Sequence, residues 1–252
     1  MRRKGRRQTW NMRGGQEVNF RVVRTLDPRA YELRSAATGI SIVGSAPKDL
    51  LFMGRAEEWD VAYIAKAPHH VSARECVTEQ IISAVGSALP LRLAESQVVL
   101  LGREVSGDRD VRFLSRYFLK RAEEQLVHGA ELVAAFLQAD PEEVERTFGR
   151  GSRAEQSFYT VEALLDILRD ACRQGEFVAV RDGFGRMLAF DAIVGANDRH
   201  AMNWGVVRNV IRSGPLRFSP LFDTARGLFW DHTDAKFRSI DQRDDREGYI
   251  RR

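Results

Sequence analysis

The spacing of apolar residues changes part-way along this 252-residue chain, and that change limits the folds open to it. Between residues 18 and 117, short runs rich in Val, Ile, Phe and Leu alternate with charged or glycine-containing breaks, a pattern typical of β-strands. From residue 118 onward, apolar residues recur mostly at helical spacing. A β-rich half followed by a helical half predicts an α+β fold of two lobes, 18–117 and 118–252, behind an N-terminal arm, 1–17.

The first half contains several predicted strands and one predicted helix. The strands cover residues 18–25, 39–43, 49–53, 61–66, 97–101 and 111–117. A capping box at 72–75 opens the helix, which runs to about Ala88. Its apolar face consists of Val77, Ile81, Ala84, Val85 and Ala88. Glu79 lies roughly 150° from the centre of that face, where a solvated glutamate is ordinary.

The second half is predicted to be mainly helical. Helices are expected at 119–138, directly after Asp140-Pro141, after the N-cap Thr160, and over the long apolar stretch 176–194. Leu126 and Val133 belong to the apolar positions of the first of these helices. Beyond them, residues 203–207 and 216–222 flank a Ser-Gly-Pro turn, which predicts a β-hairpin.

Composition excludes several classes of protein. Hydrophobic residues make up 44% of the chain and charged residues 29%, the balance of a soluble globular protein. An uncharged apolar run of the roughly 18–20 residues that a membrane span needs is lacking, and so is an apolar segment of the secretory kind behind the basic N-terminus. Two distant cysteines exclude a disulfide scaffold and a cysteine-rich zinc site. We therefore expect a cytoplasmic protein.

The net charge of +4 is concentrated in the N-terminal arm. Six basic residues lie within the first 13 positions, where no acid occurs, and without them acids slightly outnumber bases. Such an arm can contact the phosphates of a nucleic acid. A flexible tail that only keeps the chain soluble is the simpler interpretation.

The polar loop that follows the long apolar helix is the most informative part of the sequence. Asp198 and Asn203 are separated by four residues, as are the base and the magnesium-binding amide of a kinase catalytic loop. Asp223 follows at the end of the hairpin, which can return it to the same cavity. Two oxygen ligands together with nucleotide phosphates suit octahedral Mg²⁺. Taken singly, Asp198 could be a turn residue after the helix and Asp223 a loop cap.

These segments resemble the HipA-type kinases, bacterial serine/threonine kinases with a bilobal protein-kinase-like or phosphoinositide-kinase-like fold. The resemblance is carried by residues 190–204, Phe-Asp-Ala-Ile-Val-Gly-Ala-Asn-Asp-Arg-His-Ala-Met-Asn-Trp, and by residues 219–223, Ser-Pro-Leu-Phe-Asp. It implies that Asp198 is the catalytic base and that Asn203 and Asp223 bind magnesium. It also implies an ATP- and Mg²⁺-dependent reaction.

The same resemblance implies a nucleotide site in the first half. Residues 41–48 resemble the loop that covers the phosphates, with Gly44, Ser45 and Lys48 beside the nucleotide. Lys66 resembles the lysine that contacts the α- and β-phosphates, with Glu79 as its partner and Glu75 as a weaker substitute. Arg116 and Tyr117 fall where the hinge holds the adenine. Ser41 falls where some members carry an autophosphorylated serine, although it is more simply a strand residue.

The implied activity is transfer of the γ-phosphoryl group to a Ser/Thr hydroxyl of a protein, in a toxin–antitoxin setting with an antitoxin-like partner. Two alternatives stay open: a kinase of a small-molecule, lipid or peptide hydroxyl, and a nucleotide-binding pseudokinase that acts as a protein-interaction module. The chain ends soon after Asp223, whereas HipA-type catalytic lobes normally continue with several more helices, so we expect a shortened second lobe. Thr-Ala follows Asp223 in place of Phe-Gly, so the activation-loop logic of ordinary kinases is not expected.

Overall fold

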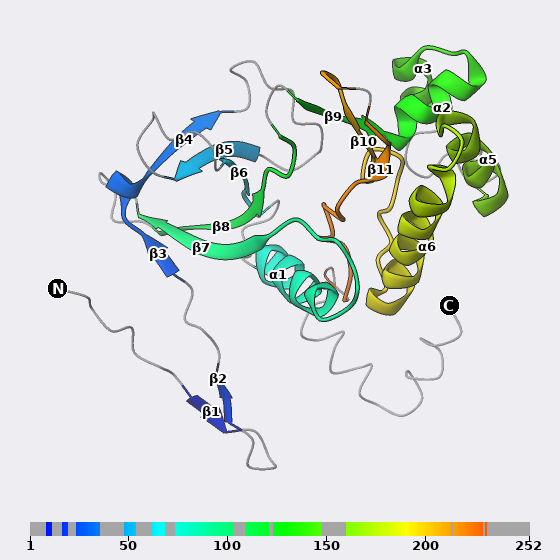
Figure 1. The fold of residues 1–252 in the computed structure, drawn as a ribbon. Helices are drawn as coiled ribbons and strands as arrows, with labels where there is room; N and C mark the ends of the chain where they lie inside the picture. The colour runs from blue at the N-terminus through cyan, green and yellow to red at the C-terminus, as the bar shows by residue number, and fades with distance from the viewer. Residues whose placement is uncertain are drawn as a thin grey trace. The chain divides into compact units, whose positions relative to one another are not determined.

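The structure, a computed structural model, describes residues 9–11, 17–19, 24–35, 48–53, 62–68, 74–102, 109–120, 123–147, 160–212, 214–228 and 230. Two compact units make up the chain (Figure 1). The first extends to Cys76 and also includes Ser96–Tyr117. The second comprises Val77–Glu95 and the chain from Phe118 onward.

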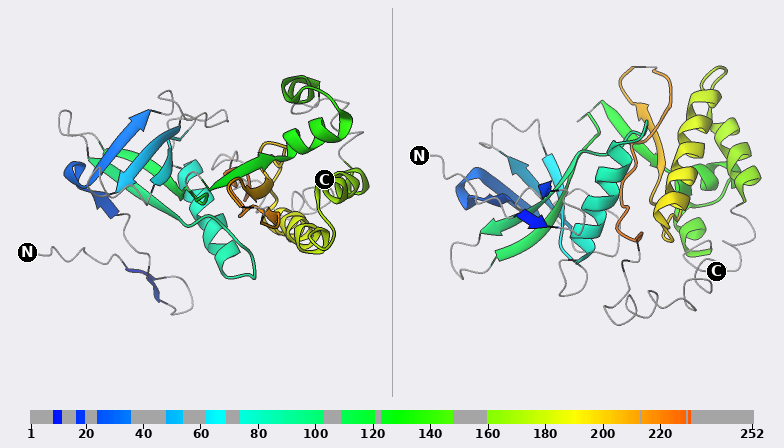
Figure 2. Two further views of the ribbon diagram at one scale, coloured as in Figure 1. Left: turned by 45° about the horizontal axis from the view of Figure 1, so that its top comes forward. Right: turned by 90° about the horizontal axis from the view of Figure 1, so that it is seen from below.

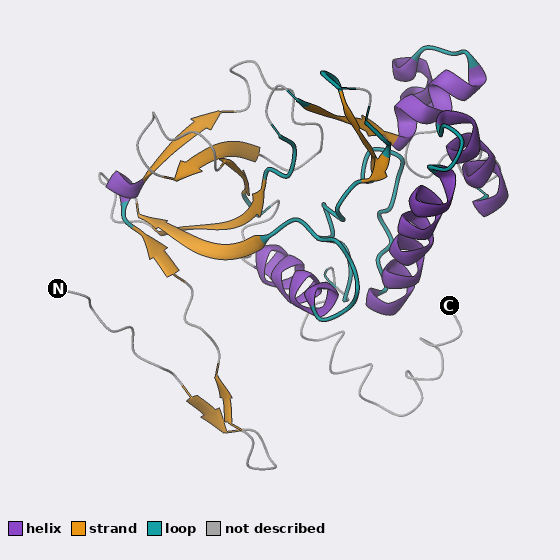
Figure 3. Ribbon diagram, in the orientation of Figure 1, coloured by secondary structure: helices purple, strands orange, loops and turns teal. Residues whose placement is uncertain are grey.

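The first unit is built on a six-stranded sheet. The strands are β3 (Arg24–Leu26), β4 (Tyr31–Ser35), β5 (Lys48–Met53), β6 (Ala62–Lys66), β7 (Ser96–Gly102) and β8 (Arg109–Arg116). Their order across the sheet is β3-β7-β8-β6-β5-β4, and every neighbouring pair is antiparallel except β3 and β7 (Figure 3). A short 3-10 turn, η1 (Pro28–Ala30), joins β3 to β4. Strands β1 (Thr9–Asn11) and β2 (Glu17–Asn19) form a separate antiparallel pair.

One face of this sheet carries the hydrophobic core of the first unit. Because side chains alternate between the two faces of a strand, residues at every second position share a face. The core cluster consists of Leu26, Leu51, Tyr63, Ala65, Val99, Leu101 and Leu114. Lys48, Lys66 and Phe113 are paired across three neighbouring strands and alternate with these residues, so they belong to the opposite face.

Most of the strands predicted in the first half are present with small shifts of their ends. The predicted strand 18–25 is divided between β2 and β3, and the predicted strand 39–43 lies outside the described residues. Strand β4 was not predicted. Its sequence, Tyr-Glu-Leu-Arg-Ser, is rich in charge, and its pairing with β5 rather than its own composition defines it as a strand.

Helix α1 (Arg74–Ser87) buries a different face from the one that its apolar residues indicate. Val77 and Ile81 are 45% and 48% exposed, whereas Glu79 is only 3% exposed. A Cβ atom at Gly86 would lie 2.7 Å from Leu93 and 3.0 Å from Phe190. The buried residues of α1 include Glu79, Ile82 and Ser83, so the solvated position expected for Glu79 from periodicity is wrong.

The described part of the second unit contains a small sheet and several helices besides α1. Its strands, in the order β11-β10-β9, are β9 (Glu124–His128), β10 (Gly205–Asn209) and β11 (Arg217–Phe218), all antiparallel. The helices are α2 (Gly129–Leu137), α3 (Pro141–Thr147), α5 (Val161–Ala171) and α6 (Phe177–Val194). Helix α6 packs against β11 (Figure 2). The rings of Phe184, Trp204 and Phe218 lie 5.4–6.3 Å apart. These aromatic contacts join the helices to the hairpin.

The helix predicted over 119–138 is wrong in its first part, because Glu124–His128 is strand β9. Strand β9 pairs with β10, Val127 opposite Val206, and the helix begins only at Gly129. Glycine is required there, since a Cβ atom would lie 2.4 Å from the Trp204 ring. The helices predicted after Asp140-Pro141 and Thr160 and over 176–194, and the hairpin, are confirmed.

Candidate active site

Helix α6 ends in a sharp turn that starts the loop carrying Asp198. Gly195 adopts the left-handed conformation, φ 61°, and its backbone N–H donates to the Asp191 carbonyl. The N–H of Ala196 donates to the same carbonyl at 2.8 Å. The carbonyl of Val194 accepts from the N–H of Leu228 at 2.8 Å. This glycine-ended C-terminus satisfies the last carbonyls of the helix and directs the chain away from the helix axis.

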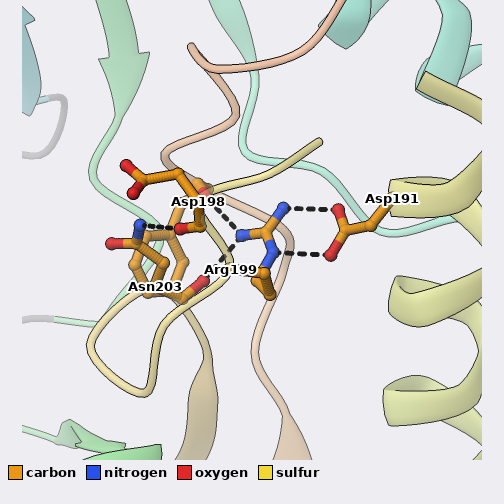
Figure 4. A network of polar contacts seen from close by, with 5 residues as sticks. Asp191, Asp198, Arg199 and Asn203 are labelled. Carbon is orange, nitrogen blue, oxygen red and sulfur yellow. Dashed lines mark hydrogen bonds and ion pairs between the residues drawn. The ribbon is translucent and has the colours of Figure 1, made fainter. Parts of the chain in front are cut away.

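A buried ion pair fixes the loop to the helix. The Nε and Nη2 atoms of Arg199 each donate to one carboxylate oxygen of Asp191 at 2.8 Å (Figure 4). Both side chains are only 9% exposed. A two-pronged arginine–carboxylate contact of this kind is strong and directional, and its partners are costly to separate once buried.

The remaining nitrogen of the same guanidinium joins the loop to the hairpin. Nη1 of Arg199 donates to the backbone carbonyls of Asn203 at 2.8 Å and Phe222 at 3.0 Å. The second of these carbonyls belongs to the residue before Asp223. One nitrogen therefore brings the backbone at Asn203 beside the backbone that leads into Asp223, as the hairpin was expected to do.

The side chain of Asn203 is held by the loop itself. Its Nδ2 donates to the backbone carbonyl of Asp198 at 2.8 Å, and its backbone N–H donates to the backbone carbonyl of His200 at 2.9 Å. Since the amide nitrogen faces Asp198, the amide oxygen faces away from it and remains an acceptor. The Asp198 carboxylate and the Asn203 amide lie on the same side of the loop, away from Asp191 (Figure 4).

Asp198 is contacted by a second arginine. Its Oδ2 lies 3.3 Å from Nε of Arg226, and Nη1 of Arg226 is 3.4 Å from Oδ1. The Arg226 guanidinium lies over the Trp230 ring, 5.0 Å from its centroid, and the Arg226 carbonyl accepts from the N–H of Asn197. The carboxylate thus has a fixed orientation and a cation beside it.

Asp223 has an uncommon backbone conformation. Its φ of 54° lies in the left-handed region, which side chains other than glycine rarely adopt and which aspartate tolerates better than most. The next residue, Thr224, is buried. Backbone held in such a conformation by its surroundings is concentrated at functional sites.

Two of the residues expected to bind phosphates face each other in the first unit. Lys48 on β5 lies directly opposite Lys66 on β6, and Lys66 is only 8% exposed. The Lys66 ammonium lies 5.7 Å from the centroid of the Phe113 ring. Like charges directly opposite each other on neighbouring strands repel, so each of these lysines is placed beside a second positive charge.

The remaining predicted residues have different surroundings. Glu79 is buried on α1, in the part of the helix that belongs to the second unit. Arg116 is exposed at the end of β8, and burial raises the pKa of Tyr117. The backbone N–H of Tyr117 donates to the Ala62 carbonyl at 2.9 Å. Ser41, Gly44 and Ser45 lie outside the described residues.

Comparison with known proteins identifies the family. The model of the HipA-like C-terminal domain matches residues 40–247. The chain belongs to the HipA-like family. The resemblance found at the loop and the hairpin therefore extends over most of the sequence, and this HipA-like chain is a kinase-like protein.

The HipA-like chain is also similar to a solved kinase structure. The crystal structure of the Helicobacter pylori proinflammatory kinase CtkA matches with a TM-score of 0.60 and 19% sequence identity, over 81% of this chain and 63% of that chain. The HipA-like chain thus spans less than two thirds of that protein. The match confirms the predicted bilobal, α+β kinase-like fold. No match was found among curated proteins.

Sequence analysis missed the three residues that hold the HipA-like loop in place: Asp191, Arg199 and Arg226. Asp191 had a signal, since it is an acid within the apolar end of α6. Such a residue inside an apolar helix requires a buried partner. Arg199 and Arg226 had no comparable signal, because their contacts depend on the folded positions of distant backbone groups.

The described residues contain no cluster of three or more His, Cys, Asp or Glu side chains able to bind a metal ion. Asn203 and Asp223 offer two protein oxygens, which suits a metal that completes its coordination with phosphate and water.

Within the described helices, none is long and apolar enough to span a membrane.

Proposed function

We propose that this HipA-like chain is an ATP- and Mg²⁺-dependent kinase that transfers the γ-phosphoryl group to a Ser/Thr hydroxyl of a protein. The observation that carries the proposal is the set of contacts made by Arg199. It links Asp191, the backbone of Asn203 and the backbone before Asp223, and so gathers the residues that this chemistry needs. Phosphoryl transfer depends mainly on positioning and charge, and a rigid loop supplies both.

Asp198 is the proposed general base. It accepts the proton of the acceptor hydroxyl as the hydroxyl oxygen forms a bond to the γ-phosphorus and the bond to the β,γ-bridging oxygen breaks, which releases ADP. The Arg226 guanidinium beside it holds the carboxylate in a fixed orientation. Asp198 and Asn203 lie on the same side of the loop. The acceptor hydroxyl would therefore approach Asp198 from that side.

Asn203 and Asp223 are the proposed magnesium ligands, and their donor chemistry fits that ion. The Asn203 amide nitrogen is engaged by the Asp198 carbonyl, which orients the oxygen as the ligand atom. The bound ion would neutralise charge on the nucleotide phosphates. Lys48 and Lys66 are the proposed phosphate contacts from the first unit, with Glu79 as the proposed partner of Lys66 and the segment at Arg116 and Tyr117 as the adenine contact.

The acceptor is proposed on family resemblance to be a protein Ser or Thr, with a translation-related target such as an aminoacyl-tRNA synthetase. A cytoplasmic location, a toxin–antitoxin setting and an antitoxin-like partner belong to the same proposal. The basic arm remains a candidate contact for nucleic acid, and most of it lies outside the described residues.

The deciding experiment is incubation of the chain with γ-labelled ATP and Mg²⁺ in the presence of a cell extract. We expect labelled protein from the wild type and a loss of about 10²–10⁴-fold in Asp198→Ala and Asp223→Ala. Asp166→Ala, which removes an exposed acid of α5, is the matched control and should transfer normally.

Two results would replace the proposal. Nucleotide binding without transfer by the wild type would identify a pseudokinase. Labelling of lipids or metabolites but not of proteins would identify a kinase of another hydroxyl.

A further inference from the structure

The second unit contains a cavity separate from the candidate active site. Its volume is about 340 Å³, within the range of small-molecule sites. It is formed by α6, by the segment after α1 and by the chain around β11. Apolar side chains that include Leu91, Met187, Leu216, Phe218 and Leu221 line it. Asp198, Asn203 and Asp223 are not among its lining residues.

The wall of the cavity opposite α6 is well ordered by hydrogen bonds. The N–H of Leu221 donates to the Arg92 carbonyl at 2.7 Å, and the N–H of Ala94 donates to the Leu221 carbonyl at 3.2 Å. These bonds form a short parallel bridge between residues 93 and 221. The cavity is therefore preformed, as ligand sites usually are.

A buried hydroxyl in this wall lacks the partner that such a group normally has. Ser219 lines the cavity and is only 3% exposed, yet its Oγ has no hydrogen-bond partner among the described residues. Its backbone N–H is satisfied by the Gly205 carbonyl. Since buried polar groups are nearly always hydrogen-bonded, the free Oγ indicates a polar ligand atom or an ordered water beside it.

The charged residues of the cavity are mainly cationic. Arg92, Arg186 and Arg217 line it together with one acid, Asp182. Asp182 is paired with Arg181 at 2.9 Å and Arg217 with Glu124 at 2.8 Å.

The other two arginines are not neutralised in this way. Among the described residues, Arg186 donates only to the Pro90 carbonyl, at 3.4 Å, and Arg92 forms no ion pair; both side chains are exposed. Arg92 and Arg186 are therefore available to an anion.

We propose that this cavity binds a small amphipathic anion, with an apolar body among Leu91, Met187 and Phe218 and a phosphate or carboxylate at Arg92 and Arg186. The Ser219 hydroxyl would hydrogen-bond a polar atom of the same ligand. The apolar lining, the free hydroxyl and the two arginines suit a single molecule that carries all three parts. The inference does not depend on the proposed kinase activity.

Phenyl phosphate is a suitable probe because it combines an aromatic ring with a dianion. Its binding would be measured by ligand-detected NMR and by titration, with saturating ADP present to occupy the nucleotide site. We expect binding by the wild type. Phenol and inorganic phosphate, which each lack one part of the ligand, should bind at least about tenfold more weakly, as should the probe to Ser219→Ala and Arg186→Gln.

A matched pair of variants on α6 tests the location. Ala179 lines the cavity and is exposed, so Ala179→Phe should fill the space without disturbing the core and weaken phenyl phosphate binding at least tenfold. Val178 is also exposed but does not line the cavity, and Val178→Phe should bind the probe as the wild type does. Absence of wild-type binding at millimolar probe, or equal binding by both variants at unchanged thermal stability, would overturn the proposal.

Discussion

Arg199 joins three stretches of chain that are far apart in sequence: the end of α6, the loop at Asn203 and the end of the hairpin at Phe222. The positions of Asn203 and Asp223 therefore depend on Arg199, a side chain that is not expected to touch the substrate. The sequence indicated Asp198, Asn203 and Asp223 through their spacing. It could not indicate Arg199, because its four acceptors come from residues 191, 203 and 222, whose proximity exists only in the fold.

Replacing Arg199 by Ala should destabilise the protein by about 3–5 kcal/mol, because it leaves the Asp191 carboxylate buried and uncompensated. Arg199→Lys should recover only part of this free energy, since one ammonium cannot replace a two-pronged contact and two carbonyl contacts. Urea denaturation measures both values. Arg181→Ala removes a half-exposed partner of Asp182 on the same helix and should cost under about 1 kcal/mol. Equal costs for the two alanine variants would contradict this account.

At the scale of elements, the helices and strands that depend mainly on their own local sequence were predictable, and those that depend on distant contacts were not. Helices α5 and α6 have long periodic patterns and clear ends at Thr160 and Gly195, so local reasoning found them. The sequence predicts helix over β9 because Leu126 and Val127 suit either structure and α2 follows without a break. Its pairing with β10, some eighty positions later, decides the matter. The buried face of α1 was missed for a similar reason, since close packing at Gly86 outweighs the apolar pattern.

The junction of β9 and α2 gives a test with an internal control. Gly129→Ala should destabilise the protein by about 1–3 kcal/mol, because the new Cβ atom would lie 2.4 Å from the Trp204 ring. Gly185→Ala, within α6, meets nothing within 4 Å and should stabilise by about 0.5–1 kcal/mol through helix propensity. Thermal and urea unfolding would measure the opposite signs. A stabilising effect at position 129 would show that the close approach to Trp204 is absent.

The small sheet contains a carboxylate that links stability to pH. Burial tends to raise the pKa of Glu124, but the N–H of Lys120 and the guanidinium of Arg217 outweigh it and hold the pKa below its ordinary value of 4.5. A lowered folded-state pKa adds stability that is complete above the unfolded-state value and is lost as the pH falls through the folded-state value.

Wild type should therefore exceed Glu124→Gln in stability at neutral pH by under about 1 kcal/mol, because the pair is partly exposed. The difference should shrink as the pH falls below 4.5 and through the lowered pKa of Glu124. Urea titrations across this range measure it, with Arg217→Gln expected to show a similar profile. A gap that widens with falling pH would contradict the assignment.

At the scale of the whole molecule, the change in apolar spacing sufficed for the α+β class, and the resemblance at the loop and the hairpin implied the kinase-like fold. The structural comparison confirms both. The proposed function assigns a phosphate contact to Lys66 and the metal ligands to Asn203 and Asp223. Sequence identified these residues by motif. It could not provide their geometry, because the backbone of Asp223 and the burial of Lys66 are set by tertiary contacts.

The effect of ligands on thermal stability tests nucleotide binding and magnesium binding separately. A ligand that binds only the folded state stabilises it by RT ln(1 + [L]/Kd), about 2.7 kcal/mol at a hundredfold excess over Kd. ADP alone should stabilise the wild type, and Mg²⁺ should add a further increment in the presence of ADP. Lys66→Ala should weaken both effects, because it removes a phosphate contact. Asp223→Ala should keep the ADP effect and lose the magnesium increment, whereas Asp166→Ala should keep both. A magnesium increment that survives in Asp223→Ala would remove Asp223 from the metal site, because no other change in that variant could replace its carboxylate.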